Sequence, residues 1–212
     1  TRLDADTVAY ILEFGNAKAL IVDRELFPLA EKALEQIELK PVLILIDDET
    51  AEVKPSVDQD VMDYEELVNS GDPNFSCPQL EDEWQTLALN FTSGTTGRPK
   101  GVVYHHRGAY LMSMGTVAGW ELPRHPRYLY CVPMFHCNGW CFPWTLAAQA
   151  GTSICLRQVE PAEIFRAIDE DGVTNLCGAP TVLNSIINAD PKDRRPLPHK
   201  VQVMTAAAPP PP

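Results

Sequence analysis

The feature that most constrains the fold of this chain is a regular alternation of short apolar runs and segments with helical spacing. Runs such as 19–22, 42–46 and 87–91 have the length of a buried strand. Between such runs the apolar side chains recur every three or four residues, as they do over 26–37 and 161–172. Strands separated by helices indicate βαβ units and therefore parallel sheets. We expect an α/β fold with predominantly parallel sheets covered by helices.

The same pattern predicts the remaining elements. Further strands are expected at 101–104, 128–132, 152–156, 173–177 and 201–205. Further helices are expected near 8–15, 64–68, 107–118 and 181–188, with weaker helical spacing over 140–150. The acidic stretch 47–83 contains three prolines, so we expect it to be mostly loop.

Composition limits the partners and the location of the protein. The chain has 17 Lys and Arg against 29 Asp and Glu, a net charge of −12, which disfavours binding to nucleic acid or an anionic membrane through bulk charge. No apolar run reaches the roughly 18 residues that a membrane-spanning helix needs, so we expect no transmembrane segment. The six cysteines form no Cys-x-x-Cys pair, and several lie in apolar runs. Free, buried thiols are typical of a reducing compartment, and we expect a cytoplasmic protein.

A metal site is suggested by three neighbouring residues, His136, Cys137 and Cys141. Their spacing matches no standard zinc pattern. We therefore expect no metal ion to be held by this chain.

The most informative motif is Thr92-Ser-Gly-Thr-Thr-Gly-Arg-Pro-Lys-Gly101, which follows an expected strand. Glycines let backbone amides approach a ligand, hydroxyls add donors, and a lysine supplies a point charge for phosphate. We expect a site for a polyphosphate here, the alternative being a polar surface turn. The segment is not a Walker A loop, because the fifth residue after Gly94 is Pro99 rather than glycine. A kinase-like P-loop protein is therefore disfavoured.

The segment Thr92–Gly101 resembles, at every signature position, the phosphate loop of the adenylate-forming superfamily. That superfamily comprises acyl-CoA synthetases, the adenylation domains of peptide synthetases and beetle luciferases. Residues 101–110 resemble the segment that follows this loop in acyl-CoA synthetases, and Pro133-Met-Phe-His-Cys-Asn-Gly-Trp140 resembles the next motif. In this form the motif is most similar to short- and medium-chain fatty acyl-CoA ligases of the methylthiopropionate-CoA ligase and plant acyl-activating type. The resemblance covers essentially the whole chain.

This resemblance implies ATP-dependent, AMP-forming activation of a short- or medium-chain carboxylic acid. The acid would become an acyl-adenylate and then, with CoA, an acyl-CoA. ATP, CoA and Mg²⁺ are the implied substrates and cofactor, and fatty acid metabolism is the implied setting. A homodimer is a separate expectation, because apolar surfaces that pack against other portions of a longer protein would be exposed on this chain. Three alternatives stay open: an adenylation domain that loads a carrier protein, an oxidative adenylate enzyme, and a nucleotide-binding module without catalysis.

The resemblance also assigns residues to the nucleotide. The residues implied to line the β- and γ-phosphates are Thr92, Ser93, Gly94, Thr95, Thr96, Gly97 and Lys100. Lys100 is given a catalytic role because it helps to neutralise the charge on these phosphates. The loop along the adenine is placed at Ala207, Ala208 and Pro209. Here the match is weaker, because Ala206 and Ala207 stand where the family commonly has glycines, and a methyl group restricts a backbone with positive φ.

A second set of residues is assigned to the acyl group. His136 is the other implied catalytic residue, and it orients the carboxylate and the α-phosphate. The implied acyl pocket consists of His136, Gly139, Trp140, Gly178, Ala179 and Pro180. Taken alone, these residues allow simpler interpretations: a structural histidine, an aromatic core residue at Trp140, and an ordinary strand-to-helix turn at 178–181. The adjacent residues 105–107 (His-His-Arg) are interpreted mainly as the start of a helix.

Several elements that this resemblance would place elsewhere in a longer protein are not found in the chain. They are a Tyr-Gly-x-Thr-Glu segment whose Glu holds Mg²⁺, an Asp for the ribose, a hinge, and a small C-terminal domain with a catalytic Lys. The chain begins at Thr1 without Met and ends in four prolines. We therefore interpret 1–212 as part of a large N-terminal AMP-binding domain. Its first strands and helices, its later portion and the C-terminal domain are expected to lie outside this chain, which alone should be inactive.

Overall fold

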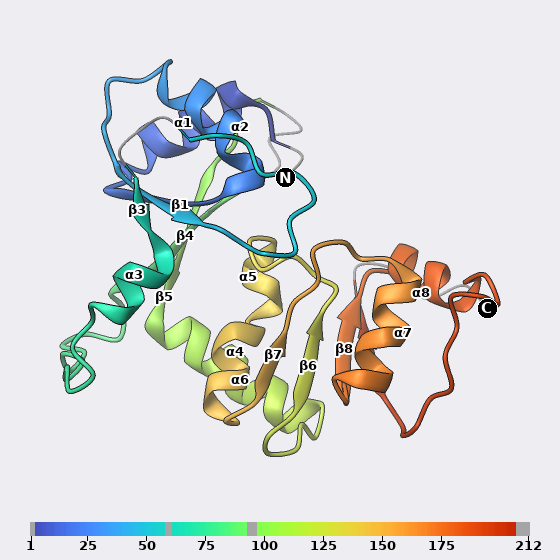
Figure 1. Ribbon diagram of the computed structural model, residues 1–212. Helices are drawn as coiled ribbons and strands as arrows, with labels where there is room; N and C mark the ends of the chain where they lie inside the picture. The colour runs from blue at the N-terminus through green and yellow to red at the C-terminus, as the bar shows by residue number, and fades with distance from the viewer. Residues whose placement is uncertain (1–2, 58–60, 93–96, 207–212) are drawn as a thin grey trace. The chain divides into compact units, whose positions relative to one another are not determined.

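The computed structural model describes residues 3–57, 61–92 and 97–206. The backbone separates into two compact units (Figure 1), each of which is described by itself. The first unit contains Thr1–Glu81 and Phe91–Val102, and the second contains Asp82–Asn90 and Val103–Pro212.

The first unit contains a three-stranded parallel sheet in the order β1 (Ala19–Asp23), β2 (Val42–Ile46) and β3 (Met62–Asp63). Its helices are α1 (Ala5–Phe14), the short 3-10 helix η1 (Arg24–Leu26), α2 (Phe27–Leu34) and α3 (Tyr64–Asn69). The sequence accounts for the ends of these helices. Asp4 caps α1 by accepting a hydrogen bond from the Thr7 amide at 2.8 Å, and Pro28 stands in the first turn of α2. Helices α1 and α2 bury the small and branched side chains of Ala9, Leu12 and Ala33 together with Ile37, which follows α2.

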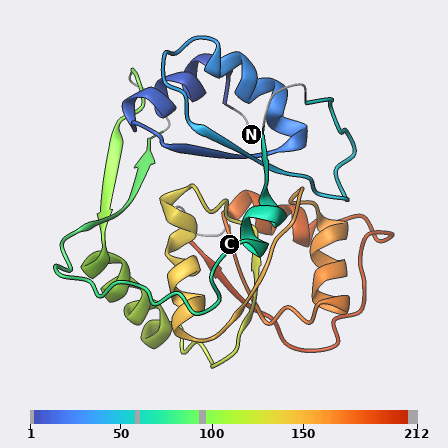
Figure 2. The same ribbon diagram turned by 60° about the vertical axis from the view of Figure 1, so that its left-hand side comes forward.

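Two strands, β4 (Thr86–Phe91) and β5 (Gly101–His105), pair with each other in a separate two-stranded sheet (Figure 2). They flank the Thr92–Gly101 segment in the sequence. The division between the two units passes through both strands.

The second unit is built on a four-stranded parallel sheet in the order β7-β6-β8-β9. The strands are β6 (Arg127–Tyr130), β7 (Thr152–Ile154), β8 (Asn175–Gly178) and β9 (Gln202–Thr205). The helical elements are α4 (His106–Gly119), α5 (Cys137–Trp140), α6 (Phe142–Ala148), α7 (Pro161–Glu170) and α8 (Pro180–Ile187).

Strand β6 is buried on both of its faces. Tyr128 and Tyr130 pack into one core cluster with Phe142 of α6, whereas Leu129 packs into a second cluster with Ile164 of α7. Successive side chains of a strand point to opposite faces, so helices cover the sheet on both sides (Figure 1). This double burial explains why residues 128–130 are large and apolar without alternation, whereas Arg127, the first residue of the strand, is exposed.

The predicted α/β architecture is confirmed, and each predicted strand is present within a few residues of its expected bounds. Strand β3 was not predicted, because two residues within an acidic stretch carry no periodic signal. None of the helices in the described ranges is long and apolar enough to cross a membrane.

The cysteines divide into two groups. Burial was expected for those in apolar runs, and Cys131, Cys141 and Cys177 are buried. Cys155 was expected to be buried and is exposed, as are Cys77 and Cys137. The expectation for Cys155 was wrong because β7 lies at the edge of the sheet and ends at Ile154, one residue earlier.

Candidate functional site

The predicted site residues in the described part of the chain fall into three segments. The first comprises the two ends of the Thr92–Gly101 loop. The second segment follows β6, and the third lies at the end of β8. The predicted phosphate-binding residues Ser93, Gly94, Thr95 and Thr96 lie outside the described residues. The same is true of the predicted adenine loop, Ala207, Ala208 and Pro209.

The two ends of the predicted phosphate loop are joined by a reciprocal pair of hydrogen bonds. The Thr92 amide donates to the Lys100 carbonyl at 3.0 Å, and the Lys100 amide donates to Thr92 Oγ1 at 3.0 Å. Gly97 has a φ of +148°, a conformation open to glycine and costly for other residues. The side chain of Lys100 is exposed, so its ammonium group is available to a ligand in solution.

Helix α1 contacts the C-terminal end of the loop, at Arg98 and Pro99. The Tyr10 hydroxyl donates to the Pro99 carbonyl at 3.1 Å, and the Arg98 guanidinium lies over the Tyr10 ring, 5.3 Å from its centroid. Phe14 and Phe91 complete this aromatic group, with ring centroids 5.5 to 6.4 Å apart. No local signal in the sequence indicates this group, because 89 positions separate Tyr10 from Pro99.

The segment after β8 is a direct passage from strand to helix. Gly178 is the last residue of the strand, Ala179 has the extended backbone of an N-cap, and Pro180 occupies the first turn of α8. The predicted strand-to-helix turn is confirmed. Strand β8 pairs in parallel with β6, with Cys177 opposite Tyr130. The segments that follow both strands therefore leave the sheet at the same edge, where α/β proteins bind ligands.

The sequence suggests that His136 lies at the end of a strand, and this expectation is wrong. Strand β6 ends at Tyr130, and His136 lies six residues later in a turn. The His136 amide donates to the Pro133 carbonyl at 3.0 Å. The strand is shorter than predicted because the Cys131 amide bonds back to the Leu129 carbonyl at 3.1 Å instead of extending the ladder. The His136 side chain is exposed.

The residues after His136 form a left-handed turn, which we define as Cys137–Cys141. Its φ values are +47°, +44°, +54°, +55° and +63° in chain order. Asn138 has ψ of 49° and Gly139 has ψ of 36°, close to the values of a left-handed helix. The element α5 is therefore left-handed, and the right-handed helix α6 begins only at Phe142. For this reason, the helix expected from the weak helical spacing over 140–150 begins two residues later than predicted, at Phe142.

Three side chains tie the left-handed turn to the rest of the second unit. Asn90 Nδ2 in β4 donates a hydrogen bond to Asn138 Oδ1. Thr145, which is fully buried, donates from Oγ1 to the Cys141 carbonyl at 2.9 Å. Trp140 is half-buried against the core cluster that contains Tyr128 and Phe142.

The adjacent residues His105, His106 and Arg107 form the start of α4, as predicted. His105 is the N-cap, and its Nδ1 accepts a hydrogen bond from the Gly108 amide at 2.9 Å. The Arg107 guanidinium forms an ion pair with Glu83 and lies 5.9 Å from the centroid of the Trp84 ring. These contacts give His105 and Arg107 structural roles at the start of the helix.

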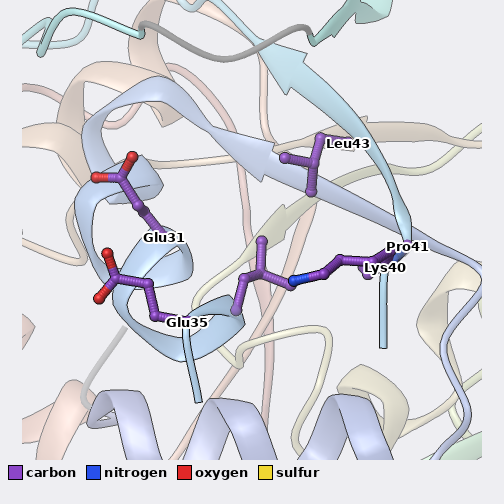
Figure 3. A pocket seen from close by; sticks show the side chains of 6 residues that line it. Glu31, Glu35, Lys40, Pro41 and Leu43 are labelled. Atoms are coloured by element: carbon purple, nitrogen blue, oxygen red, sulfur yellow. The ribbon is translucent and has the colours of Figure 1, made fainter. Parts of the chain in front are cut away.

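A shallow pocket of about 170 Å³ lies in the first unit beside α2 and the start of β2 (Figure 3). It is lined by Glu31, Leu34, Glu35, Lys40, Pro41 and Leu43. None of the predicted site residues lines it. Within 3–57, 61–92 and 97–206, no group of three or more His, Cys, Asp or Glu side chains could hold a metal ion.

Comparison with known proteins gives one family match: the family described as AMP-binding enzyme matches residues 1–212. Among curated relatives, a peroxisomal acetate/butyrate–CoA ligase of Arabidopsis thaliana and an acetate–CoA ligase of Humulus lupulus are each 47% identical over 222 residues. A peroxisomal benzoate–CoA ligase of Arabidopsis thaliana is 40% identical. All of this chain is covered in each case, and it spans 38 to 39% of these relatives.

Solved structures share the fold at lower identity. The N-terminal domain of FACL13 from Mycobacterium tuberculosis has a TM-score of 0.76 at 24% identity, covering 100% of this chain and 50% of that one. A luciferase-like enzyme from the mealworm Zophobas morio has a TM-score of 0.77 at 21% identity, covering 99% and 47%. The expected fold of the N-terminal part of an adenylate-forming enzyme is thereby confirmed.

The expected cytoplasmic location is contradicted by these relatives. The Arabidopsis acetate/butyrate–CoA and benzoate–CoA ligases are both named as peroxisomal. The expectation rested on unpaired cysteines, which indicate only that disulfides are not needed. Such a signal cannot distinguish one compartment from another.

Proposed function

We propose a function from one premise: this chain belongs to the AMP-binding enzyme family. The whole protein activates a short- or medium-chain carboxylic acid with ATP, releases pyrophosphate, and transfers the acyl group from AMP to CoA. The observation that carries this proposal is the 47% identity, over the entire chain, to ligases named for acetate and butyrate. An acyl-CoA synthetase acting in fatty acid metabolism is the corresponding role.

In this proposal the Thr92–Gly101 loop holds the β- and γ-phosphates of ATP. In-line attack on the α-phosphate requires that the leaving pyrophosphate is held in place and that its charge is balanced. Backbone amides at the glycines and the hydroxyls of the loop supply donors, and the exposed Lys100 ammonium supplies the positive charge. The joined ends of the loop, at Thr92 and Lys100, support this role because they fix where the lysine leaves the backbone.

In the same proposal, the acyl group binds beyond the carboxyl ends of the neighbouring parallel strands β6 and β8. His136, Gly139 and Trp140 come from the first segment, and Gly178, Ala179 and Pro180 come from the second. The indole of Trp140 shortens the acyl pocket and favours small acids. The adjacent position of the two strands supports this arrangement, since both segments begin at one edge.

Four further points belong to the proposal. Mg²⁺ enters with the phosphates of ATP, the usual way in which proteins bind this ion, because the described residues offer no cluster of acidic or metal-ligating side chains for it. The adenine lies along Ala207, Ala208 and Pro209, which follow β9 in the sequence. We also propose a peroxisomal location, which microscopy of a tagged full-length protein would test. We further propose a homodimer, which light scattering would test.

The deciding experiment uses the full-length protein with Mg-ATP, CoA and a mixture of carboxylic acids from short to long. Nucleotides and thioesters are measured by mass spectrometry. AMP together with one dominant acyl-CoA of short or medium length is the expected result. AMP or acyl-adenylate without a thioester would indicate an enzyme that loads a carrier protein or oxidises the adenylate. ADP, or bound nucleotide without turnover, would contradict the proposed mechanism.

A charge variant tests the phosphate loop in the same assay. Lys100→Ala should slow adenylate formation by roughly 100-fold or more, by analogy with the loss of other charge-stabilising groups, and leave the thermal unfolding midpoint unchanged. Lys192→Ala, which removes another exposed lysine, is the matched control and should leave the rate unchanged. Equal rates for both variants would remove Lys100 from the mechanism. The 212-residue chain alone should form no acyl-CoA.

A further inference from the structure

The left-handed turn Cys137–Cys141 is costly to maintain. A left-handed helical conformation costs roughly 1–2 kcal/mol for each residue with a Cβ, and four of these five residues have one. Backbone hydrogen bonds hold both ends of the turn: Gly139 donates to the His136 carbonyl at 2.9 Å, and Cys141 donates to the Asn138 carbonyl at 3.0 Å. Such strain persists only where surrounding contacts over-determine the conformation.

One of those contacts comes from far away in the sequence. Asn90 and Asn138 are 48 residues apart, and both are half-buried. A hydrogen bond between two partly buried amides is stronger than one in water, and the loss of one partner leaves the other unsatisfied. Asn138 also suits its place in the turn, because asparagine tolerates the left-handed region better than most residues with a Cβ.

The contact joins two segments that adjoin predicted site residues in the sequence. Asn90 lies in β4, two residues before Thr92, where the phosphate loop begins. Asn138 lies two residues after His136, which immediately precedes the turn and has an exposed side chain. Tyr104 of β5 is a further neighbour of the turn. Partial burial raises the pKa of its hydroxyl, with smaller contributions from the thiols of Cys137 and Cys141.

We propose that Asn90 and Asn138 are a positioning pair that holds the left-handed turn and thereby orients His136 for adenylate formation. This inference rests on the function proposed above. Neither asparagine is assigned a contact with the substrate. Both act through His136, Asn138 by its place in the turn and Asn90 by its hydrogen bond to Asn138.

The kinetic test uses the full-length enzyme and measures adenylate formation through pyrophosphate exchange. Asn90→Ala should lower kcat by about 10- to 100-fold, the range expected when a reacting group is displaced by up to about 1 Å, and should change KM for ATP by less than about twofold. Asn138→Asp retains an acceptor and should preserve most of the activity. Asn138→Gly retains the backbone freedom but removes the amide, and it should resemble Asn90→Ala.

A double-mutant cycle separates positioning from a general loss of stability. If Asn90 acts through His136, Asn90→Ala should reduce the rate by less than about twofold in a His136→Ala background, because coupled residues are not additive. The matched control is Asn188→Ala, which removes an exposed asparagine that donates to the Asn184 carbonyl at 2.9 Å, and it should leave kcat unchanged. A loss of the same size in both backgrounds, or active variants without any loss, would overturn the proposal.

A second measurement does not depend on activity. Cys141 is buried at the end of the turn, whereas Cys137 is exposed. If the pair holds the turn, Asn90→Ala should accelerate the alkylation of Cys141 at least about tenfold at an unchanged unfolding midpoint, as expected for local opening. An unchanged Cys141 rate would overturn the proposal, even if the wild-type enzyme were active. A wild-type protein that forms no adenylate, with a faster Cys141 rate in the variant, would instead reject the proposed function and retain the role of the pair in holding the turn.

Discussion

Two neighbouring strands of one sheet are followed by segments built in opposite ways. After β8, which ends at Gly178, the chain needs only Ala179 before α8 begins, with Pro180 in the first helical turn. After β6 it passes through a turn at His136 and the left-handed turn Cys137–Cys141 before α6 begins. The first segment follows local rules of strand end, N-cap and proline, whereas the second depends on side chains that are distant in sequence.

The difference shows where the structure stores strain. Backbone of the β8 segment lies in ordinary conformations, with φ of −62° at Ala179. In the β6 segment, five successive residues have positive φ and are held by Asn90 and Thr145. A substitution should therefore cost more after β6 than the matched substitution after β8.

The largest expected difference is between two glycine-to-alanine substitutions. Gly139 has φ of +54°, and an added Cβ would lie 3.2 Å from the Cα of Met134. We expect Gly139→Ala to lower the free energy of unfolding by about 3 kcal/mol, through backbone strain and overpacking. At Gly178 a Cβ would meet only side-chain atoms of Val182 and Leu183, at 3.3 Å or more, so we expect a loss of about 1 kcal/mol. Urea unfolding of both variants measures the two losses, and equal losses would remove the distinction between the segments.

The next prediction concerns a property that the two strands should share. Burial raises the pKa of the Cys131 thiol, just after β6, and of the Cys177 thiol, in β8, to about 12 from an ordinary value of 9.0. A raised pKa means that the folded protein keeps a proton that the unfolded chain loses. Each thiol therefore contributes its full stabilisation below pH 9, and this contribution falls as the pH rises from 9 towards 12.

At pH 10 the expected loss is about 1.4 kcal/mol for each thiol. It is measured as the change in unfolding free energy between pH 8 and pH 10, compared between the wild type, Cys131→Ala and Cys177→Ala. Each variant should lose about 1.4 kcal/mol less than the wild type over this interval. If only one of the two variants lost less unfolding free energy than the wild type, the two thiols would not be buried alike.

The smallest expected difference is between two hydroxyl groups that bond to a backbone carbonyl. Thr145 Oγ1 donates to the carbonyl of Cys141, at the end of the left-handed turn, and Thr145→Val should cost about 1 kcal/mol. Ser185 Oγ donates to the Val182 carbonyl at 2.7 Å within α8. Ser185→Ala should cost less than about 0.5 kcal/mol, because alanine favours the helix and offsets the lost bond. Thermal unfolding midpoints of both variants provide the measurement, and a larger loss at Ser185 would contradict the comparison.

The same contrast explains what the sequence could predict. Strands, helices and the turn at Gly178–Pro180 depend on residues that are close together in the chain, and periodicity and capping reveal them. The left-handed turn was not predicted, although the Asn138-Gly139 dipeptide is a signal for positive φ that could have indicated it. Neither the bond from Asn90 nor the bond from Tyr10 to Pro99 has a local signal, because they span 48 and 89 residues.

The hydrogen bonds between Thr92 and Lys100 have a consequence for the entropy of ligand binding. Bringing together the ends of a flexible segment of this length costs on the order of 2 kcal/mol in chain entropy. Here that entropy is lost when the protein folds, and the two hydrogen bonds, one between backbone groups and one to the Thr92 hydroxyl, compensate for it. If the loop binds phosphate as proposed, the ligand meets a segment whose ends are already fixed, and its contacts contribute to affinity instead of closing the loop.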